Sequence, residues 1–309
     1  MTDTPRLLVT VPGQALLNAL GAPPAGAEVR VWDLTGEPPA DRIDLVVPPY
    51  MGAAARLSAL EGVATQLVQS QSIGYDDVPA ALPAGHIFAN AASVHETSTA
   101  ELTLALILAS QRGIPHFVRA AGEGRWAPAR YESLADRRVL LLGYGGVGRA
   151  IEARLAPFEV ELTRVASRAR SDEQGFIRGI DELPTLLPNA DIVVVGVPLT
   201  GTTTGLVDAD FLAALPDGAL VVNIARGRVA DTEAIIAEAE SGRLRFALDV
   251  TDPEPLPAGH PLFALPNVLV SPHVGGASTA MMPRMARLLR EQIERMLRGD
   301  APLNVVYRS

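Results

Sequence analysis

Short apolar runs rich in valine and leucine alternate along this chain with segments whose apolar residues recur at helical spacing. Four runs come first, at Leu7–Val11, Val29–Trp32, Leu45–Val47 and Gln66–Gln69. Six more follow, at Arg138–Gly143, Glu161–Ala166, Asp191–Val197, Ala219–Ile224, Phe246–Val250 and Val268–Ser271. The apolar character of the second series is continuous rather than alternating, which is typical of strands buried on both faces of a parallel sheet. The pattern predicts an α/β fold with two doubly wound parallel sheets.

Helical patterns occupy the connections, as parallel strands require. They lie at Gly148–Leu155, Asp208–Leu215 and Thr232–Ala239, and two longer ones lie at Thr99–Gln111 and Thr279–Arg298. The last of these predicts that the chain returns to the first sheet after completing the second. We therefore predict one domain from residues 1–98 and 280–309, with a second domain, residues 99–279, inserted in it.

The composition excludes several kinds of chemistry. The chain has no cysteine, which removes disulfides, thiolate nucleophiles and cysteine-ligated metal sites. All 26 basic side chains are arginine, so no lysine can form a Schiff base or serve a P-loop. The 35 acidic residues bring the net charge to −9, which argues against nucleic acid as the main partner. No apolar run reaches the roughly 20 residues of a membrane span, and we expect a cytoplasmic protein with no membrane partner and no metal.

The clearest local motif is a G-x-G-x-x-G sequence. A predicted strand from Val139 leads into Gly143-Tyr144-Gly145-Gly146-Val147-Gly148, and a predicted helix follows. In such motifs the first glycine allows a tight turn, the second lets a pyrophosphate approach the backbone, and the third lets helix and strand pack closely. The context predicts a dinucleotide-binding site of the Rossmann type; a glycine-rich turn without a ligand is the alternative interpretation.

The end of the next predicted strand bears on the choice of dinucleotide. NAD-binding domains place an acidic residue about 20 positions after the glycine motif, where it holds the ribose 2′-hydroxyl. Here Ser167 and Arg168 stand at that strand end instead. A hydroxyl and a planar guanidinium suit a 2′-phosphate, which predicts NADP as the cofactor, with NAD as the alternative. A solvated loop with incidental arginines is the other interpretation of these residues.

Three further strand ends carry groups that suit catalysis. Arg226 follows the run that ends at Ile224, Asp249 and Glu254 lie at and beyond the end of the next, and His273 follows the last. Ligands of open parallel sheets bind outside the carboxyl ends of the strands. A guanidinium, an imidazole and a carboxylate are what reduction of an anionic 2-oxo acid needs to bind the substrate and donate a proton. The competing interpretation, a purely structural ion pair of Arg226 with Glu254, would contribute little net stability.

In this order and spacing the motifs resemble the D-isomer-specific 2-hydroxyacid dehydrogenase family, which includes glyoxylate/hydroxypyruvate reductases, phosphoglycerate dehydrogenases and D-lactate dehydrogenases. The resemblance runs from Ser72-Ile73-Gly74 through Thr99-Ala100-Glu101 and the glycine motif to the segment around His273. It implies a Rossmann cofactor domain inserted in a flavodoxin-like, substrate-binding domain. It also implies a homodimer, with the helix that begins near Thr99 as an interface element, unless the apolar face of that helix packs in the core.

The resemblance also implies roles for individual residues. Arg226 would hold the substrate carboxylate and polarise the carbonyl, His273 would be the acid/base, and Glu254 would tune it. The backbone at Ile73 and Gly74 would hold the same carboxylate. The remaining cofactor contacts implied are Tyr144, Gly146, Val147, Val197, Pro198, Ala225 and Gly275, with Asp249 beside the nicotinamide.

These observations together predict an oxidoreductase that transfers a hydride between NADPH and a small 2-oxo acid, such as glyoxylate or hydroxypyruvate, to give the D-2-hydroxy acid. Two alternatives stay open. One is an NAD-dependent, phosphoglycerate dehydrogenase-like enzyme. The other is a dinucleotide-sensing binding protein like the corepressors that share this fold, since fold alone does not settle function.

Overall fold

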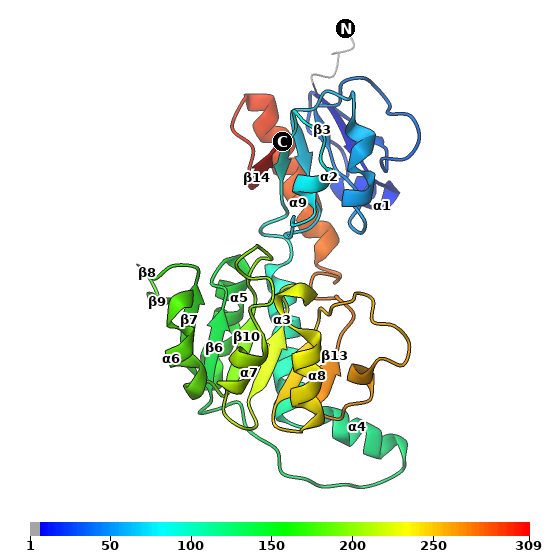
Figure 1. The fold of residues 1–309 in the computed structure, drawn as a ribbon. Helices are drawn as coiled ribbons and strands as arrows, with labels where there is room; N and C mark the ends of the chain where they lie inside the picture. The colour runs from blue at the N-terminus through cyan, green and yellow to red at the C-terminus, as the bar shows by residue number, and fades with distance from the viewer. Residues whose placement is uncertain (1–6) are drawn as a thin grey trace. The chain divides into compact units, whose positions relative to one another are not determined.

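The computed structural model describes residues 7–309, and its internal contacts divide them into two units. The first unit consists of the residues up to His95 together with Ser278–Ser309, and the second is Glu96–Ala277 (Figure 1). The division falls slightly before the predicted position at Thr99, because helix α3 (Glu96–Gln111) begins at Glu96.

The first unit is built on a six-stranded sheet of order β14-β5-β4-β3-β1-β2. Its strands are β1 (Leu7–Val11), β2 (Ala27–Val31), β3 (Leu45–Val46), β4 (Leu67–Gln69), β5 (Ile87–Ala89) and β14 (Val305–Arg308). The first five are parallel in the order 2-1-3-4-5 of flavodoxin-like folds, as predicted. Strand β14 pairs antiparallel with β5, and the sequence patterns predicted neither of these two short strands.

Helices cover both faces of this sheet. On one face α1 (Gln14–Leu20) and α9 (Met281–Arg298) share a core with the strands, and on the other η1 (Ala54–Leu60) and α2 (Val78–Ala81) do so. Buried polar contacts join α9 to the sheet, since the Gln292 side-chain amide donates to Gln69 Oε1 at 2.7 Å and to the Leu303 carbonyl at 3.0 Å. The last helix therefore belongs to the first unit.

The second unit contains an eight-stranded sheet of order β13-β12-β11-β10-β6-β7-β9-β8. Its strands are β6 (Arg138–Leu142), β7 (Glu161–Ala166), β8 (Arg170–Asp172), β9 (Gly175–Gly179), β10 (Ile192–Val195), β11 (Leu220–Asn223), β12 (Arg245–Leu248) and β13 (Val268–Val270). All pair in parallel except β8, which forms an antiparallel hairpin with β9 that the sequence patterns did not predict. The strand order reverses between β6 and β10, and such a switch point is where open α/β sheets bind ligands.

Two cores flank this sheet, as expected of a doubly wound domain. Along β10, Val193 and Val195 face the core formed with α6 (Leu183–Leu186), α7 (Ala209–Ala213) and α8 (Thr232–Glu240). The alternate residues Ile192 and Val194 face the core formed with α3 and α5 (Gly146–Leu155). The apolar face of α3 therefore packs in the core, which is the alternative that the sequence analysis left open for this helix.

The remaining elements are short or peripheral. Helix α4 (Ile114–Gly122) follows α3, and single turns lie at η2 (Ala156–Phe158), η3 (Ile180–Glu182), η4 (Leu187–Asn189), η5 (Gly227–Val229) and η6 (Pro261–Phe263). Within residues 7–309, no helix combines the length and apolar character needed to cross a membrane. The same residues contain no cluster of three or more histidine or acidic side chains that could hold a metal ion.

Candidate active site

The glycine motif forms the turn from β6 to α5, and two of its glycines are sterically required. Gly143 has a φ of +108°, and a Cβ there would lie 2.5 Å from the Gly196 carbonyl group. A Cβ at Gly148 would overlap the Gly143 carbonyl oxygen, so helix and strand approach each other closely. A Cβ at Gly145 would meet no protein atom within 4 Å, which leaves the space above the turn open to a ligand.

The amino end of α5 has the properties of an anion site. Helices α7 and α8 begin with Asp208 and Asp231, whose carboxylates accept hydrogen bonds from first-turn N–H groups. Helix α5 is preceded instead by Gly145, and no side chain caps its first turn. The first N–H groups of a helix have no partner within it and carry partial positive charge, so they suit a pyrophosphate. The residues present thus fit the diphosphate of a dinucleotide.

The side chain of Tyr144 faces into the protein rather than toward the open turn. It is 3% exposed, and its hydroxyl donates to Glu152, which also accepts from Arg164. Burial, followed by the contact with the Glu152 carboxylate, raises the pKa of Tyr144 to about 12. Tyr144 can therefore contact a dinucleotide through its backbone, while its ring holds the turn in place.

The end of β7 concentrates positive charge. Ser167 and Arg168 are both exposed there, at the point where the chain enters the β8–β9 hairpin. Arg170 of that hairpin donates to the Tyr144 carbonyl at 3.0 Å, and Arg149 of α5 lies 3.7 Å from Asp172. The hairpin thus joins the glycine turn to the strand end that carries Arg168. The sequence analysis assigned no role to Arg170, although it lies only two positions after Arg168.

Arg226 lies in a turn that the neighbouring residues hold rigidly. The buried Asn223 at the end of β11 donates to the Arg226 carbonyl at 3.1 Å and accepts from the Ala225 N–H at 3.0 Å. A Cβ at Gly227 would overlap the Thr251 carbonyl, so this turn lies directly against the segment that follows β12. The end of β11 therefore lies against the segment that follows β12.

Asp249 and His273 connect the ends of β12 and β13. Asp249 is 3% exposed and accepts from the Val274 and Gly275 N–H groups at 2.9 Å each. The His273 N–H donates to the Asp249 carbonyl at 2.7 Å. His273 itself has a φ of +52°, a left-handed conformation that costs a non-glycine residue about 1–2 kcal/mol. Its surroundings impose this conformation, which is common at functional sites.

The imidazole of His273 pairs with Glu254. Nδ1 lies 2.6 Å from Glu254 Oε1, and both side chains are about two-fifths exposed. A carboxylate accepts only, so Nδ1 donates and Nε2 remains accessible for another partner. The structure therefore joins the predicted imidazole and carboxylate in one dyad. It stands on the carboxyl edge of the sheet that also carries the glycine turn.

The remaining predicted residues belong partly to the second unit and partly to the first. Val197 and Pro198 follow β10, Ala225 adjoins Arg226, and a Cβ at Gly275 would lie 2.9 Å from Asp249 Oδ2. Ile73 and Gly74 belong to the first unit, in the loop after β4, where the Asn90 side-chain amide donates to the Ile73 carbonyl at 2.9 Å. Sequence reasoning missed Thr99, whose side chain borders the same position at Gly275.

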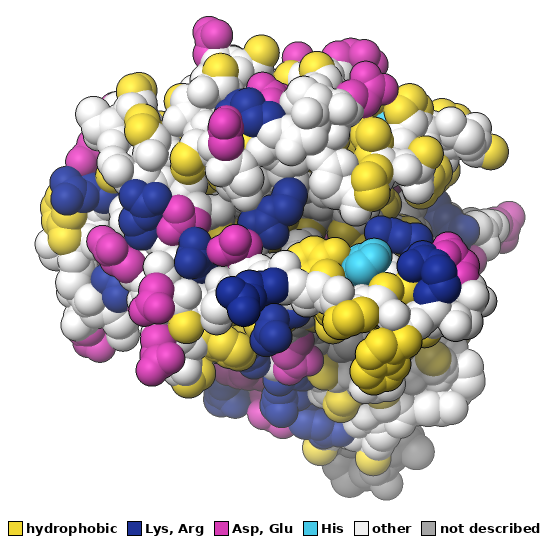
Figure 2. Space-filling view, turned by 90° about the horizontal axis from the view of Figure 1, so that it is seen from below, with side chains coloured by type: hydrophobic (Ala, Val, Ile, Leu, Met, Phe, Trp, Pro, Cys, Tyr) yellow, Lys and Arg dark blue, Asp and Glu magenta, His cyan; other side chains and the backbone are white. Residues whose placement is uncertain are grey.

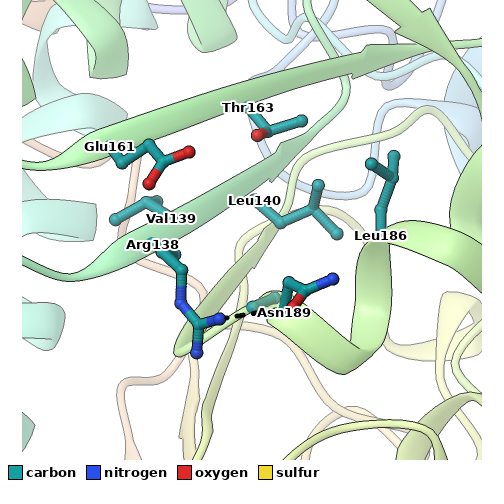
Figure 3. Close-up of a pocket in the computed structure, with 8 residues that line it drawn as sticks. Arg138, Val139, Leu140, Glu161, Thr163, Leu186 and Asn189 are labelled. Atoms are coloured by element: carbon teal, nitrogen blue, oxygen red, sulfur yellow. Dashed lines mark hydrogen bonds between the residues drawn. The ribbon is translucent and has the colours of Figure 1, made fainter.

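A small cavity in the second unit lies at the opposite edge of the sheet. Its volume is about 70 Å³, and its wall includes the first residues of β6 and β7 (Figure 3). Arg138 at its rim is paired with Asp191 at 2.7 Å, and this guanidinium lowers the pKa of the Asp191 carboxyl. The charges there satisfy each other, so the edge with the glycine turn is the better candidate for chemistry.

Comparison with known proteins gives consistent matches. Residues 104–275 match the model of the D-isomer specific 2-hydroxyacid dehydrogenase NAD binding domain. A glyoxylate reductase of Thermofilum pendens is 32% identical over 273 residues, which cover 85% of this chain and 77% of that protein. The glyoxylate reductase/hydroxypyruvate reductase of Homo sapiens is 29% identical over 294 residues, 89% and 90% of the two chains. A D-isomer specific 2-hydroxyacid dehydrogenase from Xanthobacter autotrophicus, solved with NADPH and MES, is 31% identical with a TM-score of 0.84 over 98% of both chains.

Proposed function

Because the chain belongs to the D-isomer specific 2-hydroxyacid dehydrogenase family, we propose that it is a reductase that converts small 2-oxo acids to D-2-hydroxy acids with NADPH. Glyoxylate and hydroxypyruvate are the substrates we propose first, since relatives named for them cover most of this chain. The observation that carries the proposal is the dyad of His273 and Glu254, which shares one sheet edge with an uncapped glycine turn.

Each group of this edge has a part in the proposed reaction. Arg226 binds the substrate carboxylate and draws electron density toward the carbonyl oxygen, as a guanidinium fork does. His273 donates the proton on Nε2 to that oxygen, and Glu254 stabilises the positive imidazole beforehand through Nδ1. When bound, the reduced nicotinamide supplies the hydride for the carbonyl carbon. The role implied for Ile73 and Gly74, which belong to the first unit, stays a prediction.

The cofactor preference is proposed from the end of β7. Exposed Ser167 and Arg168 offer a hydroxyl and a guanidinium where an NAD enzyme would place a carboxylate. Arg170 and Arg149 add positive charge around the same turn. A 2′-phosphate would gain charge-assisted hydrogen bonds there, which favours NADP over NAD.

A substrate and cofactor panel tests the proposal. We expect NADPH oxidation with glyoxylate or hydroxypyruvate, and a kcat/KM for NADPH at least about tenfold above that for NADH, which corresponds to about 1.4 kcal/mol. Product analysis on a chiral column should show the D isomer where the product has a stereocentre. Absence of turnover with any 2-oxo acid would refute the reductase.

Two alternative functions give different results in the same panel. A phosphoglycerate dehydrogenase-like enzyme would prefer NAD and a phosphorylated substrate. A dinucleotide-sensing binding protein would capture a partner in a cofactor-dependent way without turnover. The intact dyad of His273 and Glu254 favours the reductase, because a sensor needs no proton donor at this edge.

We also propose a homodimer, with α4 in place of α3 as the interface. Ile114 and Val118 of α4 are 47% and 65% exposed, and Trp126 just after the helix is 96% exposed. Exposed apolar side chains of this size gather at contact surfaces. Sedimentation of a Val118→Glu, Trp126→Ser variant, compared with the unaltered protein, tests it; an unchanged mass would refute this interface.

The distribution of charge is consistent with a small-molecule partner. Figure 2 shows arginine and acidic side chains interspersed over the face it draws, rather than a broad basic surface. The cytoplasmic location expected from the sequence stays a prediction, and cell fractionation is the measurement for it.

A further inference from the structure

The loop that carries His273 is held by a side chain that the proposed mechanism does not use. Ser271 is the first residue after β13, and its hydroxyl donates to Asp249 Oδ1 at 2.7 Å. The same oxygen accepts from the Val274 N–H, while Oδ2 accepts from the Gly275 N–H. Two oxygens of one buried carboxylate thus receive three donors from a loop of five residues, 271–275.

The hydroxyl of Ser271 is the one side-chain donor among the three groups of the loop that restrain the orientation of that carboxylate. A carboxylate can rotate about its terminal torsion, which is broad and not strongly staggered. With Oδ1 held from both ends of the loop, by Ser271 and by Val274, the rotation is restricted and Oδ2 is directed at Gly275. Without the hydroxyl, the carboxylate keeps only the two N–H contacts at the end of the loop, and Oδ1 loses its contact with the start of the loop, in a site where an unmade hydrogen bond is unfavourable.

This arrangement bears directly on His273, which lies between the two points of attachment. Its left-handed backbone, with a φ of +52°, is unfavourable for a side chain of this size and persists because the loop on either side is fixed. Its ring must also stay within 2.6 Å of Glu254. A hydrogen bond that short tolerates little displacement of the backbone that carries the donor.

We propose that Ser271 is a positioning residue for the acid/base: through Asp249, its hydroxyl holds His273 in the conformation in which Nδ1 donates to Glu254 and Nε2 stays free for substrate. The proposal rests on the proposed function, because positioning has a catalytic effect only if His273 is the proton donor. It assigns to Asp249 a task apart from contact with the dinucleotide, since its oxygens are already engaged by this loop.

The test compares three substitutions of Ser271 with one control. Ser271→Ala removes the hydroxyl, Ser271→Thr keeps it, and Ser271→Cys is a second, nearly isosteric variant in case the alanine variant does not fold. Ser241→Ala is the control, because Ser241 lies in the same unit at the end of α8 and its hydroxyl donates only locally, to the Glu238 carbonyl at 2.9 Å.

The first measurement is independent of activity. In two-dimensional NMR of ligand-free protein labelled at its five histidines, the His273 signal is identified by its loss in His273→Gln. In spectra recorded at a pH at which the imidazole is neutral, we expect a single tautomer with the proton on Nδ1 in the unaltered protein, in Ser271→Thr and in Ser241→Ala. In Ser271→Ala and Ser271→Cys we expect the signal to move toward a mixture of the two tautomers.

The second measurement is kinetic. We expect Ser271→Ala to lower kcat by about tenfold to 100-fold, as small misplacements of a catalytic group do, while the Kd for NADPH stays within about twofold. The solvent deuterium isotope effect on kcat should rise, because proton donation becomes slower. Ser271→Thr should restore kcat, which a merely structural role would not require.

Two results would overturn the proposal. One is an unaltered His273 spectrum and kcat in Ser271→Ala. The other is a raised Kd for NADPH with unaltered kcat, which would mean that Ser271 serves the dinucleotide through Asp249. If the unaltered protein turns over no 2-oxo acid, the proposed function fails, and the NMR comparison still decides whether Ser271 positions His273.

Discussion

Two single glycine-to-alanine variants in the turn between β6 and α5 distinguish the role of this turn in binding a ligand from its role in packing. In Gly145→Ala the new methyl group meets no protein atom within 4 Å, and φ at this residue is negative, so the backbone is not in the left-handed region. We therefore expect the free energy of unfolding to change by less than about 1 kcal/mol. The methyl group would, however, occupy the space through which a pyrophosphate approaches the first N–H groups of α5. Loss of one charge-assisted hydrogen bond, about 1.5–3 kcal/mol, predicts a Kd for NADPH raised about tenfold to 100-fold.

Gly148→Ala is the opposite case. Its methyl group would overlap the Gly143 carbonyl oxygen, and that atom is backbone and cannot turn aside. The gain in helix propensity is about 1 kcal/mol, and an overlap with backbone places the overpacking in the upper half of its usual range of about 1–3 kcal/mol, so we expect a net loss of stability of about 1–2 kcal/mol. Gly201→Ala is the matched control, because a Cβ at Gly201 also meets nothing within 4 Å and the residue lies in the same unit.

Urea unfolding and titration of NADPH fluorescence measure the two effects separately. The reasoning requires Gly145→Ala to lose affinity at nearly constant stability, and Gly201→Ala to lose neither. An unchanged Kd for NADPH in Gly145→Ala would refute the assignment of this turn to the pyrophosphate. Unchanged stability in Gly148→Ala would refute the close contact between helix and strand.

Three further predictions concern the dyad, the cofactor and pH. In Glu254→Gln the imidazole keeps a hydrogen-bond acceptor but loses the negative charge beside it. We therefore expect kcat/KM for the 2-oxo acid to fall about 10²- to 10⁴-fold, with little change in the melting temperature. A loss of kcat/KM below about threefold would contradict the role of the charge. In Arg168→Ala the KM for NADPH should rise about tenfold or more while that for NADH stays constant, and equal effects on both would show that Arg168 does not contact the 2′-phosphate. Burial lowers the pKa of His86, whose Nδ1 lies 2.7 Å from Thr65 Oγ1, below the usual 6.5. The unfolded chain therefore binds the extra proton first, so stability is complete above pH 6.5 and falls as the pH drops through the lowered pKa. Urea unfolding of His86→Gln across this range should show a weaker loss on acidification, and an identical pH dependence would exclude this histidine as its source.

The parts of the fold that were predictable share one property: their information is local. The runs at β6, β10 and β11 are continuously apolar because both faces of these strands are buried. Such a run is recognisable in the sequence without knowledge of which strands pair with it. The glycines at positions 143 and 148 were recognisable because only a residue without a side chain fits such turns. The missed strands β5, β8, β9 and β14 have three to five residues each, and the hairpin strands β8 and β9 also carry charged residues and glycines in place of an apolar run.

The sequence by itself determined the α/β class, the glycine turn between β6 and α5, and the residue types at the strand ends, since each of these depends on near neighbours in the chain. The tertiary structure alone decided which of those residues meet. It paired Glu254 with His273 across 19 positions, engaged the Asp249 carboxylate with the His273 loop, and turned the ring of Tyr144 inward. The physical reason is that the relative placement of strand ends follows from the packing of whole layers, and no stretch of sequence contains both partners of such a contact.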